Sequence, residues 1–418
     1  MYNFPIGPAM GRGGGNRREM RKILLALIFA AALPLKAAEI QFVESAPDET
    51  VYGSTLAARP AAVWLAMIGS AKKTLDIEQF YIADLAGEVL EPVLSAVKDA
   101  AKRGVKVRFM VDKVMMKESG KSLPALKEAG VETSVIDFKK AGGGVQHAKF
   151  FIVDGVEVYV GSQNFDWRSL KHIHELGLRL KSSKAAADLA IVFEADWALA
   201  GGAEPRRMFA KKSKAAITSA KPEKAVLNGA EVSYSLAFSP VNFVPKGADT
   251  EINELLNLLD KAKRTVRGQV MTYSLEEHGS KRWADLDTAF RKAAARGVKV
   301  ELVFADWAMG GKADRDIKAL SKTENIHIKI ASIPQHSSGL IPFARVEHLK
   351  YLLVDGETGY ITTSNWGPGY FLTSRGVAVF VKGRAAAAVI EDIFNKTWAG
   401  PYSQPVDPLK EYRPVKRI

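Results

Sequence analysis

The chain contains one pattern twice: HAKFFIVDGVEVYVGSQN at residues 147–164 and HLKYLLVDGETGYITTSN at residues 348–365. In each copy a lysine follows the histidine by two residues, an aspartate follows the lysine by five, and an asparagine follows the aspartate by ten. Residues i and i+2 of a strand lie on one face. Each copy therefore predicts an imidazole and an ammonium group side by side, where one phosphate group could bind both.

The repeat extends beyond this motif. AKKT at residues 71–74 returns as AKRT at 262–265, and AKRGVKV at 101–107 returns as AARGVKV at 294–300. The offsets are 191 and 193 residues, compared with 201 for the motif. Three matches in the same order indicate a tandem duplication of a unit of roughly 190 residues.

Each repeat alternates helical and strand-like stretches. Helices are predicted at 58–70, 87–102, 251–262 and 285–295, and strands at 74–82 and 265–273. Inside the first motif, Asp154-Gly155 predicts a tight turn between strands at 150–153 and 156–160. This alternation predicts an α/β fold with a sheet in each half.

Length and composition limit the possible functions. The chain has 418 residues, enough for two domains or one large two-lobed body. Its net charge is +13, of which about +8 remains without the first 37 residues. That excess favours an anionic partner such as nucleic acid, acidic lipid or another phosphate ester, although an inert basic surface would have the same charge. The absence of cysteine excludes disulfides, thiol catalysis and cysteine metal sites.

Residues 1–38 are predicted to be an N-terminal lead and signal peptide outside the fold. Basic residues between Arg17 and Lys22 precede an apolar run at 23–33, and small residues at 37–38 suit cleavage. Met20 could begin the signal by itself, and an uncleaved anchor is the alternative. Export to the periplasm or the exterior is expected. The predicted remainder is a first half at 39–210, a linker at 211–230, a second half at 231–405 and a C-terminal tail at 406–418.

The paired motifs resemble those of the phospholipase D superfamily, in particular its endolysosomal 5′-exonuclease branch, which is similar to poxvirus envelope phospholipases. Further stretches carry the same resemblance: GSQNFDWRSL at 161–170, IPFARVEH at 341–348 and WAGPYS at 398–403. The similar region covers roughly residues 40–405. The resemblance implies two α/β/α sandwich halves packed about a pseudo-twofold axis, with one active site between them.

The residue types in the motif suit phosphodiester cleavage without a metal ion. That reaction needs a nucleophile, an acid for the leaving oxygen, and fixed donors for the phosphoryl oxygens. His147 and His348 can divide the first two tasks. The donors can come from Lys149, Asn164, Lys350 and Asn365. No metal site and no cofactor are expected.

The resemblance also implies individual roles. His147 would form a phosphohistidine, while His348 would protonate the leaving group and then activate water; the symmetry of the sequence by itself leaves this assignment open. Glu175 would orient a catalytic histidine, across the boundary between halves. The equivalent residue of the second half is Gly376. The two histidines are therefore expected to differ in pKa and role.

Other residues near the motifs are candidates for supporting roles. Four are predicted to shape the motif rather than to act on substrate: Asp154, Ser162, Asp355 and Thr363. Three aromatic residues after the motifs belong either to the core or to a rim that contacts substrate: Trp167, Trp366 and Tyr370. His172 and His174 could form a metal pair, but structural histidines are the favoured interpretation.

Three functions fit the sequence. The favoured one is cleavage of single-stranded nucleic acid from its 5′ end. The first alternative is hydrolysis or transfer of phospholipid headgroups, with peripheral contact to an anionic membrane. The second alternative is a weakly active, envelope-associated binding protein, which only Gly376 supports. The sequence does not determine the oligomeric state.

Overall fold

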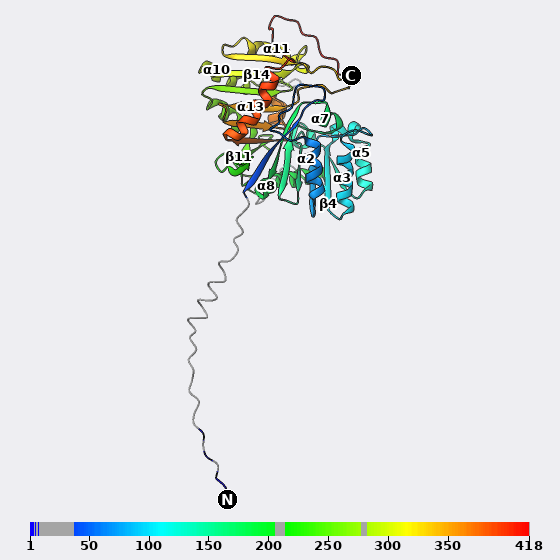
Figure 1. The fold of residues 1–418 in the computed structure, drawn as a ribbon. Helices are drawn as coiled ribbons and strands as arrows, with labels where there is room; N and C mark the ends of the chain where they lie inside the picture. The colour runs from blue at the N-terminus through cyan, green and yellow to red at the C-terminus, as the bar shows by residue number, and fades with distance from the viewer. Residues whose placement is uncertain (4, 6, 8–36, 205–213, 277–281, 418) are drawn as a thin grey trace. The chain divides into compact units, whose positions relative to one another are not determined.

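The computed structural model describes the chain except residues 4, 6, 8–36, 205–213, 277–281 and 418 (Figure 1). The chain divides into two units, Met1–Ala37 and Ala38–Ile418, and the helices and strands given below belong to the second. The predicted signal peptide lies almost wholly outside the described residues. Within the described part, no helix is long and apolar enough to cross a membrane.

Seven strands form the sheet of the first half. In spatial order they are β5 (Glu132–Ile136), β4 (Lys106–Asp112), β2 (Thr74–Glu78), β6 (Phe150–Val153), β7 (Glu157–Gly161), β9 (Glu175–Lys181) and β1 (Ala38–Ser45). The first three are parallel to one another, and the remaining pairs are antiparallel. Strand β6 is apolar and buried throughout, because packed side chains cover both faces of the sheet.

The second half repeats this order strand for strand. Its strands are β15 (Ile326–Ala331), β14 (Lys299–Ala305), β13 (Thr265–Val270), β16 (Lys350–Val354), β17 (Thr358–Thr362), β18 (Gly376–Lys382) and β11 (Ala230–Ser239). Parallel and antiparallel pairs also occur in the same places. A short strand, β19 (Ser403–Pro405), adds to the edge beside β15. The predicted α/β duplication is confirmed.

One further strand connects the two sheets. Strand β10 (Glu223–Leu227) pairs with β1 on one side and with β11 on the other. These residues lie in the stretch at 211–230 that composition assigned to a linker. They form a strand because Ala225 and Leu227, two residues apart, are buried on one face, while Lys224 before them stays at the surface.

Helices cover the outer face of each sheet (Figure 1). They are α2 (Pro60–Ser70), α3 (Glu91–Lys102) and α5 (Ser122–Glu128) in the first half, and α9 (Glu251–Asp260), α10 (Asp285–Ala295) and α11 (Lys312–Ser321) in the second. Helix α3 begins four residues later than predicted, with Pro92 in its first turn, where a missing N–H costs nothing. Each set of three helices packs over its own apolar core.

The two halves also share a core. Helices α8 (Ser183–Ala200) and α13 (Arg384–Trp398) contribute Phe193 and Phe394 to a cluster that includes strands of both sheets. Burial of apolar side chains from both halves stabilises their association by roughly 25 cal/mol for each Å² removed from water. This core keeps the ends of corresponding strands at fixed positions.

Short elements complete the fold. Strands β3 (Ile82–Ala83) and β8 (Phe165–Asp166) pair with each other, and β12 (Asp249–Thr250) pairs with β11. The remaining helices are η1 (Lys113–Met115), α4 (Met116–Ser119), α6 (Phe138–Gly142), α7 (Trp167–Lys171), η3 (Asp306–Ala308) and α12 (Pro368–Leu372). Several of them supply walls of the pocket described below.

The aspartate of each motif sits at the turn of its hairpin. Asp154 and Gly155 have φ angles of 52° and 66°, as a two-residue hairpin turn requires. The Asp154 carboxylate accepts hydrogen bonds from the backbone N–H groups of residues 72–74, at 2.7–3.2 Å. Asp355 does the same for residues 263–265. Both carboxylates therefore lock the motif hairpin to the start of the neighbouring strand.

Replacing Asp154 should destabilise the fold. Asp154→Ala loses three backbone hydrogen bonds to a charged acceptor and places alanine at a positive φ, so we expect the free energy of unfolding to fall by about 2–4 kcal/mol. Asp154→Asn tolerates that φ and keeps an acceptor, so its loss should be smaller. Urea unfolding measures both. The exposed Asp99 is a matched control, and Asp99→Ala should change the free energy by at most about 0.5 kcal/mol. Equal losses for all three variants would contradict the locking role.

Candidate active site

The strand ends bring both motifs to one place. His147 and Lys149 directly precede β6, and Asn164 follows β7. Because β6 and β7 are antiparallel, the start of one strand and the end of the other lie at the same edge of the sheet. His348, Lys350 and Asn365 have the same relation to β16 and β17. The predicted return of each asparagine to its histidine is what the hairpin produces.

Backbone pairing between the halves fixes the two histidines relative to each other. The N–H of His147 donates to the carbonyl of Arg375 at 3.0 Å, and the N–H of Arg375 donates to the carbonyl of Val145 at 2.9 Å. In the equivalent arrangement of the second motif, the N–H of His348 donates to the carbonyl of His174 at 2.8 Å, and the N–H of His174 donates to the carbonyl of Val346 at 3.1 Å. Each motif histidine is thus held by the strand that begins with Glu175 or Gly376 in the opposite half.

Both histidines line one cavity of about 360 Å³. Its walls come from both halves and comprise Phe80, Tyr81, Met115, Glu118, His147, Asn164, Arg168, Ile173, Met271, Trp307, Phe343, Val346, His348, Asn365 and Tyr370. This size is in the ordinary range for small-ligand pockets. The volume and the convergence of both motifs make this cavity the candidate active site.

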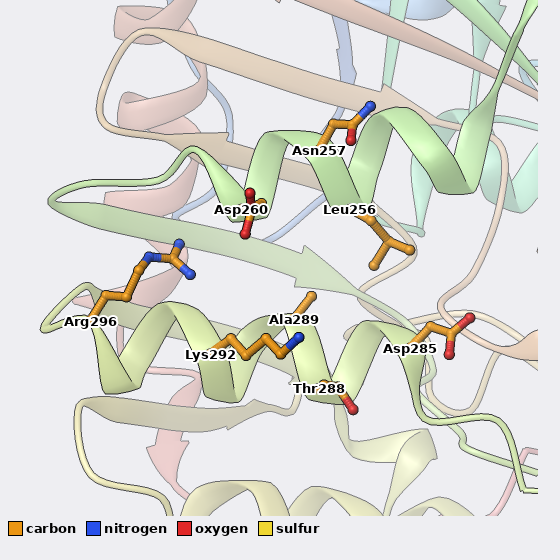
Figure 2. Close-up of a pocket in the computed structure, with 8 residues that line it drawn as sticks. All are labelled: Leu256, Asn257, Asp260, Asp285, Thr288, Ala289, Lys292 and Arg296. Atoms are coloured by element: carbon orange, nitrogen blue, oxygen red, sulfur yellow. The ribbon is translucent and has the colours of Figure 1, made fainter.

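A second hollow lies elsewhere, between α9 and α10 on the outer face of the second half (Figure 2). Its lining is mostly polar, and it includes none of the motif residues. Arg296 at one end donates to the carbonyls of Leu259 and Ala262, and so joins the two helices. The hollow is a surface feature of helix packing and carries none of the chemistry considered below.

The two motif lysines are fully buried behind the histidines. Nζ of Lys149 donates to the carbonyl of His147 at 2.6 Å, and Nζ of Lys350 donates to the carbonyl of His348 at 2.7 Å. Burial lowers the pKa of Lys149 well below its usual value, and the neighbouring Lys350 adds to this effect. Burial lowers the pKa of Lys350 to about 7. An anion bound between the lysines would restore their charge and gain strongly from it.

The asparagines offer buried polar atoms to the cavity. Neither amide atom of Asn365 has a hydrogen-bond partner among the described residues, and the same holds for Oδ1 of Asn164. Buried polar groups are nearly always satisfied in folded proteins, so such orphans indicate a ligand. The Asn365 amide is suited to donate to a phosphoryl oxygen.

The two imidazoles have different Nδ1 partners. Nδ1 of His147 faces the backbone carbonyl of Thr363 at 2.9 Å, whereas Nδ1 of His348 faces Oε2 of Glu175 at 2.8 Å. A carbonyl only accepts, so Nδ1 of His147 carries the proton and Nε2 carries the lone pair. Burial, followed by the charges of the two lysines, lowers the pKa of both histidines well below the usual value. The free pocket thus holds a neutral His147 ready to attack an electrophile.

Glu175 connects the two halves at the level of the reacting groups. It is fully buried at the start of β9, and it accepts a hydrogen bond from Ser169 beside its contact with His348. Burial raises its pKa to about 7, although Lys350 opposes that change. The pair formed by Glu175 and His348 can therefore take up a proton near neutral pH. The His147–carbonyl pair has no such second site for a proton.

Comparison with known proteins agrees with this geometry. The family model for the PLD-like domain described as cardiolipin synthase matches residues 64–197 and 255–398, one segment in each half. The 5′-3′ exonuclease PLD3 of Bos taurus is 32% identical over 401 residues, covering 88% of this chain and 81% of the relative. The chain belongs to the phospholipase D family. Phospholipase D Z of Dictyostelium discoideum is 30% identical over 385 residues, covering 88% of this chain and 90% of the relative.

A solved structure supports the fold of this phospholipase D family member. Phosphatidylserine synthase of Haemophilus influenzae superposes with a TM-score of 0.59, covering 83% of this chain and 85% of that one. Sequence identity is only 12%, so this likeness concerns the fold alone. The two-half architecture is therefore shared by proteins whose sequences have diverged widely.

Of the three aromatic residues predicted for either the core or the rim, Tyr370 alone lines the cavity. The centre of its ring lies 5.0 Å from the centre of the His147 ring. Trp366 is wrong as a rim residue: it is 1% exposed and packs with Phe290 and Phe304 in the outer core. Trp167 is half-buried and contacts His172, outside the cavity lining.

Other aromatic walls were not predicted. Phe80 and Tyr81 follow the end of β2, next to the start of its antiparallel neighbour β6, which places them beside the motif. Their position could have been inferred from the strand order, had it been known. Trp307 and Phe343 come from η3 and from the loop before His348, and no spacing in the sequence connects them to the site.

His174 and Arg375 are equivalent buried cations beside the active site. Arg375 forms two hydrogen bonds to Asp196, at 2.6 and 2.8 Å. His174 lies between Glu347, at 2.8 Å, and Glu44, at 3.0 Å. Burial alone would lower the pKa of His174, but the two carboxylates outweigh it and raise the pKa to about 9. His174 is therefore structural, as favoured from the sequence, and it is charged at neutral pH.

The charge of His174 should make stability depend on pH. Its pKa is raised above the unfolded value of 6.5, so its stabilisation is complete below pH 6.5 and is lost as pH rises through about 9. Between pH 7 and pH 10 the free energy of unfolding should fall by about 2–3 kcal/mol more in the wild type than in His174→Gln. Urea unfolding at both pH values measures this difference.

The exposed His327 on β15 provides the matched control. His327→Gln should have the same pH dependence as the wild type, including the background from lysine and tyrosine titration. Parallel curves for the wild type and His174→Gln would show that His174 is uncharged in the fold.

Proposed function

We propose that this protein is a phosphodiesterase in which His147 attacks phosphorus and His348 transfers the protons, without a metal ion. The observation that carries the proposal is the difference between their Nδ1 partners in one cavity. A nucleophile needs a free lone pair, which the carbonyl-bound His147 has at Nε2. A proton donor needs a stabilised imidazolium, which the carboxylate of Glu175 favours for His348.

In the first step, Nε2 of His147 attacks the phosphorus and the bond to the leaving oxygen breaks. His348 gives its proton to that oxygen and becomes neutral. Burial and the lysines keep the pKa of His348 low in the free site, but the negative phosphodiester and Glu175 oppose them once substrate binds. The charge that grows on the phosphoryl oxygens is stabilised by four side chains: Lys149, Asn164, Lys350 and Asn365.

In the second step, neutral His348 takes a proton from water and the water oxygen attacks the phosphorus. The N–P bond breaks, and His147 returns to its neutral state. Each displacement inverts phosphorus, so the complete reaction retains its configuration. The two lysines supply the positive charge that other phosphodiesterases obtain from metal ions.

Single-stranded nucleic acid is the favoured substrate. Five aromatic side chains surround the histidines: Phe80, Tyr81, Trp307, Phe343 and Tyr370. Bases stack on such rings irrespective of sequence, with about 1–3 kcal/mol per base. The net charge of +13 adds long-range attraction for a polyanion. The name of the relatives, 5′-3′ exonuclease, supports attack from the 5′ end.

Phospholipid is the second candidate. Ile173, Met271 and Val346 give part of the cavity an aliphatic wall, which suits an acyl or glycerol group better than a base. The name phospholipase D Z supports this candidate, in which headgroup hydrolysis or transfer would occur at an anionic membrane surface. We also propose export through the predicted signal peptide, to the periplasm or the exterior.

The roles of the histidines can be separated with a substrate whose leaving group needs no acid. Bis(p-nitrophenyl) phosphate should give the wild type steady turnover in the presence of a chelator. His348→Ala should release about one nitrophenolate per enzyme and then slow by about 10²–10⁴-fold, because water lacks its base. His147→Ala should give no burst. A burst from His147→Ala but not from His348→Ala would reverse the roles.

Two parallel assays decide the substrate class. Purified protein with chelator is given end-labelled single-stranded oligonucleotide, or phosphatidylcholine vesicles with about 20 mol% anionic lipid. Stepwise release of nucleotides from the 5′ end is the expected result, and His147→Ala should abolish it. Release of choline without nucleotides would favour the lipid reaction. Absence of both products, in the wild type and His147→Ala alike, would favour the weakly active binding protein.

A further inference from the structure

The second half lacks the carboxylate that Glu175 provides in the first. Glu175 lies opposite Ser45 in the ladder of β9 and β1, and Gly376 lies opposite Ser239 in the ladder of β18 and β11. The positions are equivalent, so a glycine stands in the second half where the first half has the carboxylate. His147 accordingly has no acidic partner at Nδ1 and faces the carbonyl of Thr363.

Another carboxylate occupies the space beside Gly376. A Cβ atom on Gly376 would lie 2.5 Å from the hydroxyls of Ser239 and Ser364, and 3.1 Å from Oε2 of Glu251. Glu251 is the first residue of α9 and is completely buried. The equivalent residue in the first half, 191 positions earlier, is Pro60 at the start of α2. At this end of the sheet, the first half therefore has a carboxylate on a strand, Glu175 of β9, and the second half has one on a helix, Glu251 of α9.

Glu251 holds the segment that faces His147. Its Oε1 accepts from the hydroxyl of Tyr360 at 2.7 Å and from that of Thr362, and its Oε2 accepts from Ser364 at 2.9 Å. The Thr362 hydroxyl oxygen in turn accepts from the N–H of Ser364 at 3.0 Å. The residues on both sides of Thr363 are thus bound to one carboxylate.

Thr363 itself is fixed by the neighbouring strand. Its N–H donates to the carbonyl of Val377 at 3.0 Å, and its hydroxyl accepts from the N–H of Val377 at 3.0 Å. The flanks of Thr363 are bound to Glu251, and Thr363 itself is bound to β18 through its N–H and its hydroxyl oxygen. Its carbonyl faces Nδ1 of His147 at 2.9 Å. That hydrogen bond keeps the proton on Nδ1 and the lone pair on Nε2.

We propose that Glu251 is a positioning residue for His147, acting through the backbone of residues 362–364 in place of a direct carboxylate. The proposal rests on the proposed function, in which His147 is the nucleophile. A direct carboxylate would favour an imidazolium, which cannot attack phosphorus, whereas a carbonyl held in place by Glu251 orients the ring and leaves it neutral. Glu251 in this way orients the ring of His147 without placing a negative charge beside it.

The first half supplies a matched control. Tyr159 is the equivalent of Tyr360, and its hydroxyl donates to the side chain of Gln163 instead of to a carboxylate. Tyr360→Phe removes one contact of Glu251, and Tyr159→Phe removes the corresponding contact in the first half, where the acceptor is Gln163. Both changes delete one buried hydroxyl at equivalent positions of the two sheets, so they should affect stability to a similar extent.

The first measurement separates the two chemical steps. In the His348→Ala background, where bis(p-nitrophenyl) phosphate gives a burst, Glu251→Gln should slow the burst by about 10–100-fold, the usual scale for a misplaced catalytic group, and leave the later phase of hydrolysis unchanged. Tyr360→Phe should have a smaller effect in the same direction, and Tyr159→Phe none. Equal slowing of both phases by Glu251→Gln would indicate general damage to the fold and overturn the proposal.

The second measurement needs no turnover. In protein labelled with ¹⁵N-histidine, the Nδ1–H resonances of His147 and His348 are assigned from their disappearance in His147→Ala and His348→Ala. Glu251→Gln should shift the His147 resonance and leave that of His348 in place. An unchanged His147 resonance would overturn the proposal. If the wild type cleaves no phosphodiester, the proposed function fails, but the resonance still decides whether Glu251 positions His147.

Discussion

The active site depends on backbone hydrogen bonds that cross between the halves. The strand-like stretch ending at His147 pairs with Arg375, and the stretch ending at His348 pairs with His174. Alternate residues of an extended chain face opposite sides, so a slip of one residue would turn each histidine away from the cavity. The shared core of α8 and α13 maintains this register, because the two halves cannot separate without exposing it to water.

Duplication has produced a symmetric backbone with asymmetric chemistry. In the first half Gln146 donates to Glu78, whereas in the second Gln269 donates to Glu347, so amide and acid have exchanged positions. The adjacent cation is a permanent one at Arg375 and a titratable one at His174. Each half thus pairs a buried amide with a buried acid, but with the two residue types exchanged. The consequence at the centre is one histidine beside a carbonyl and one beside a carboxylate.

Much of the architecture could be predicted from the sequence, because it depends on local patterns. The repeated motif, the hairpin turn at Asp154-Gly155 and the helix–strand alternation are all contained in short stretches. Prediction was wrong for Trp366, since a tryptophan next to a motif residue can point to either side of the strand end. It missed the wall formed by Trp307 and Phe343, which come from elements far apart in the sequence.

The sequence by itself determined the candidate reacting groups: two histidines, two lysines and two asparagines at a spacing that a β-hairpin brings together. Only the tertiary structure decided which partner each imidazole meets. Glu175 reaches His348 across the boundary between halves, and Glu251 lies 113 residues before Ser364, to which it is hydrogen-bonded. Such contacts depend on the packing of whole halves, which no local spacing encodes. The sequence indicated that the two motifs differ, through Glu175 and Gly376, and the fold decided which imidazole faces which partner.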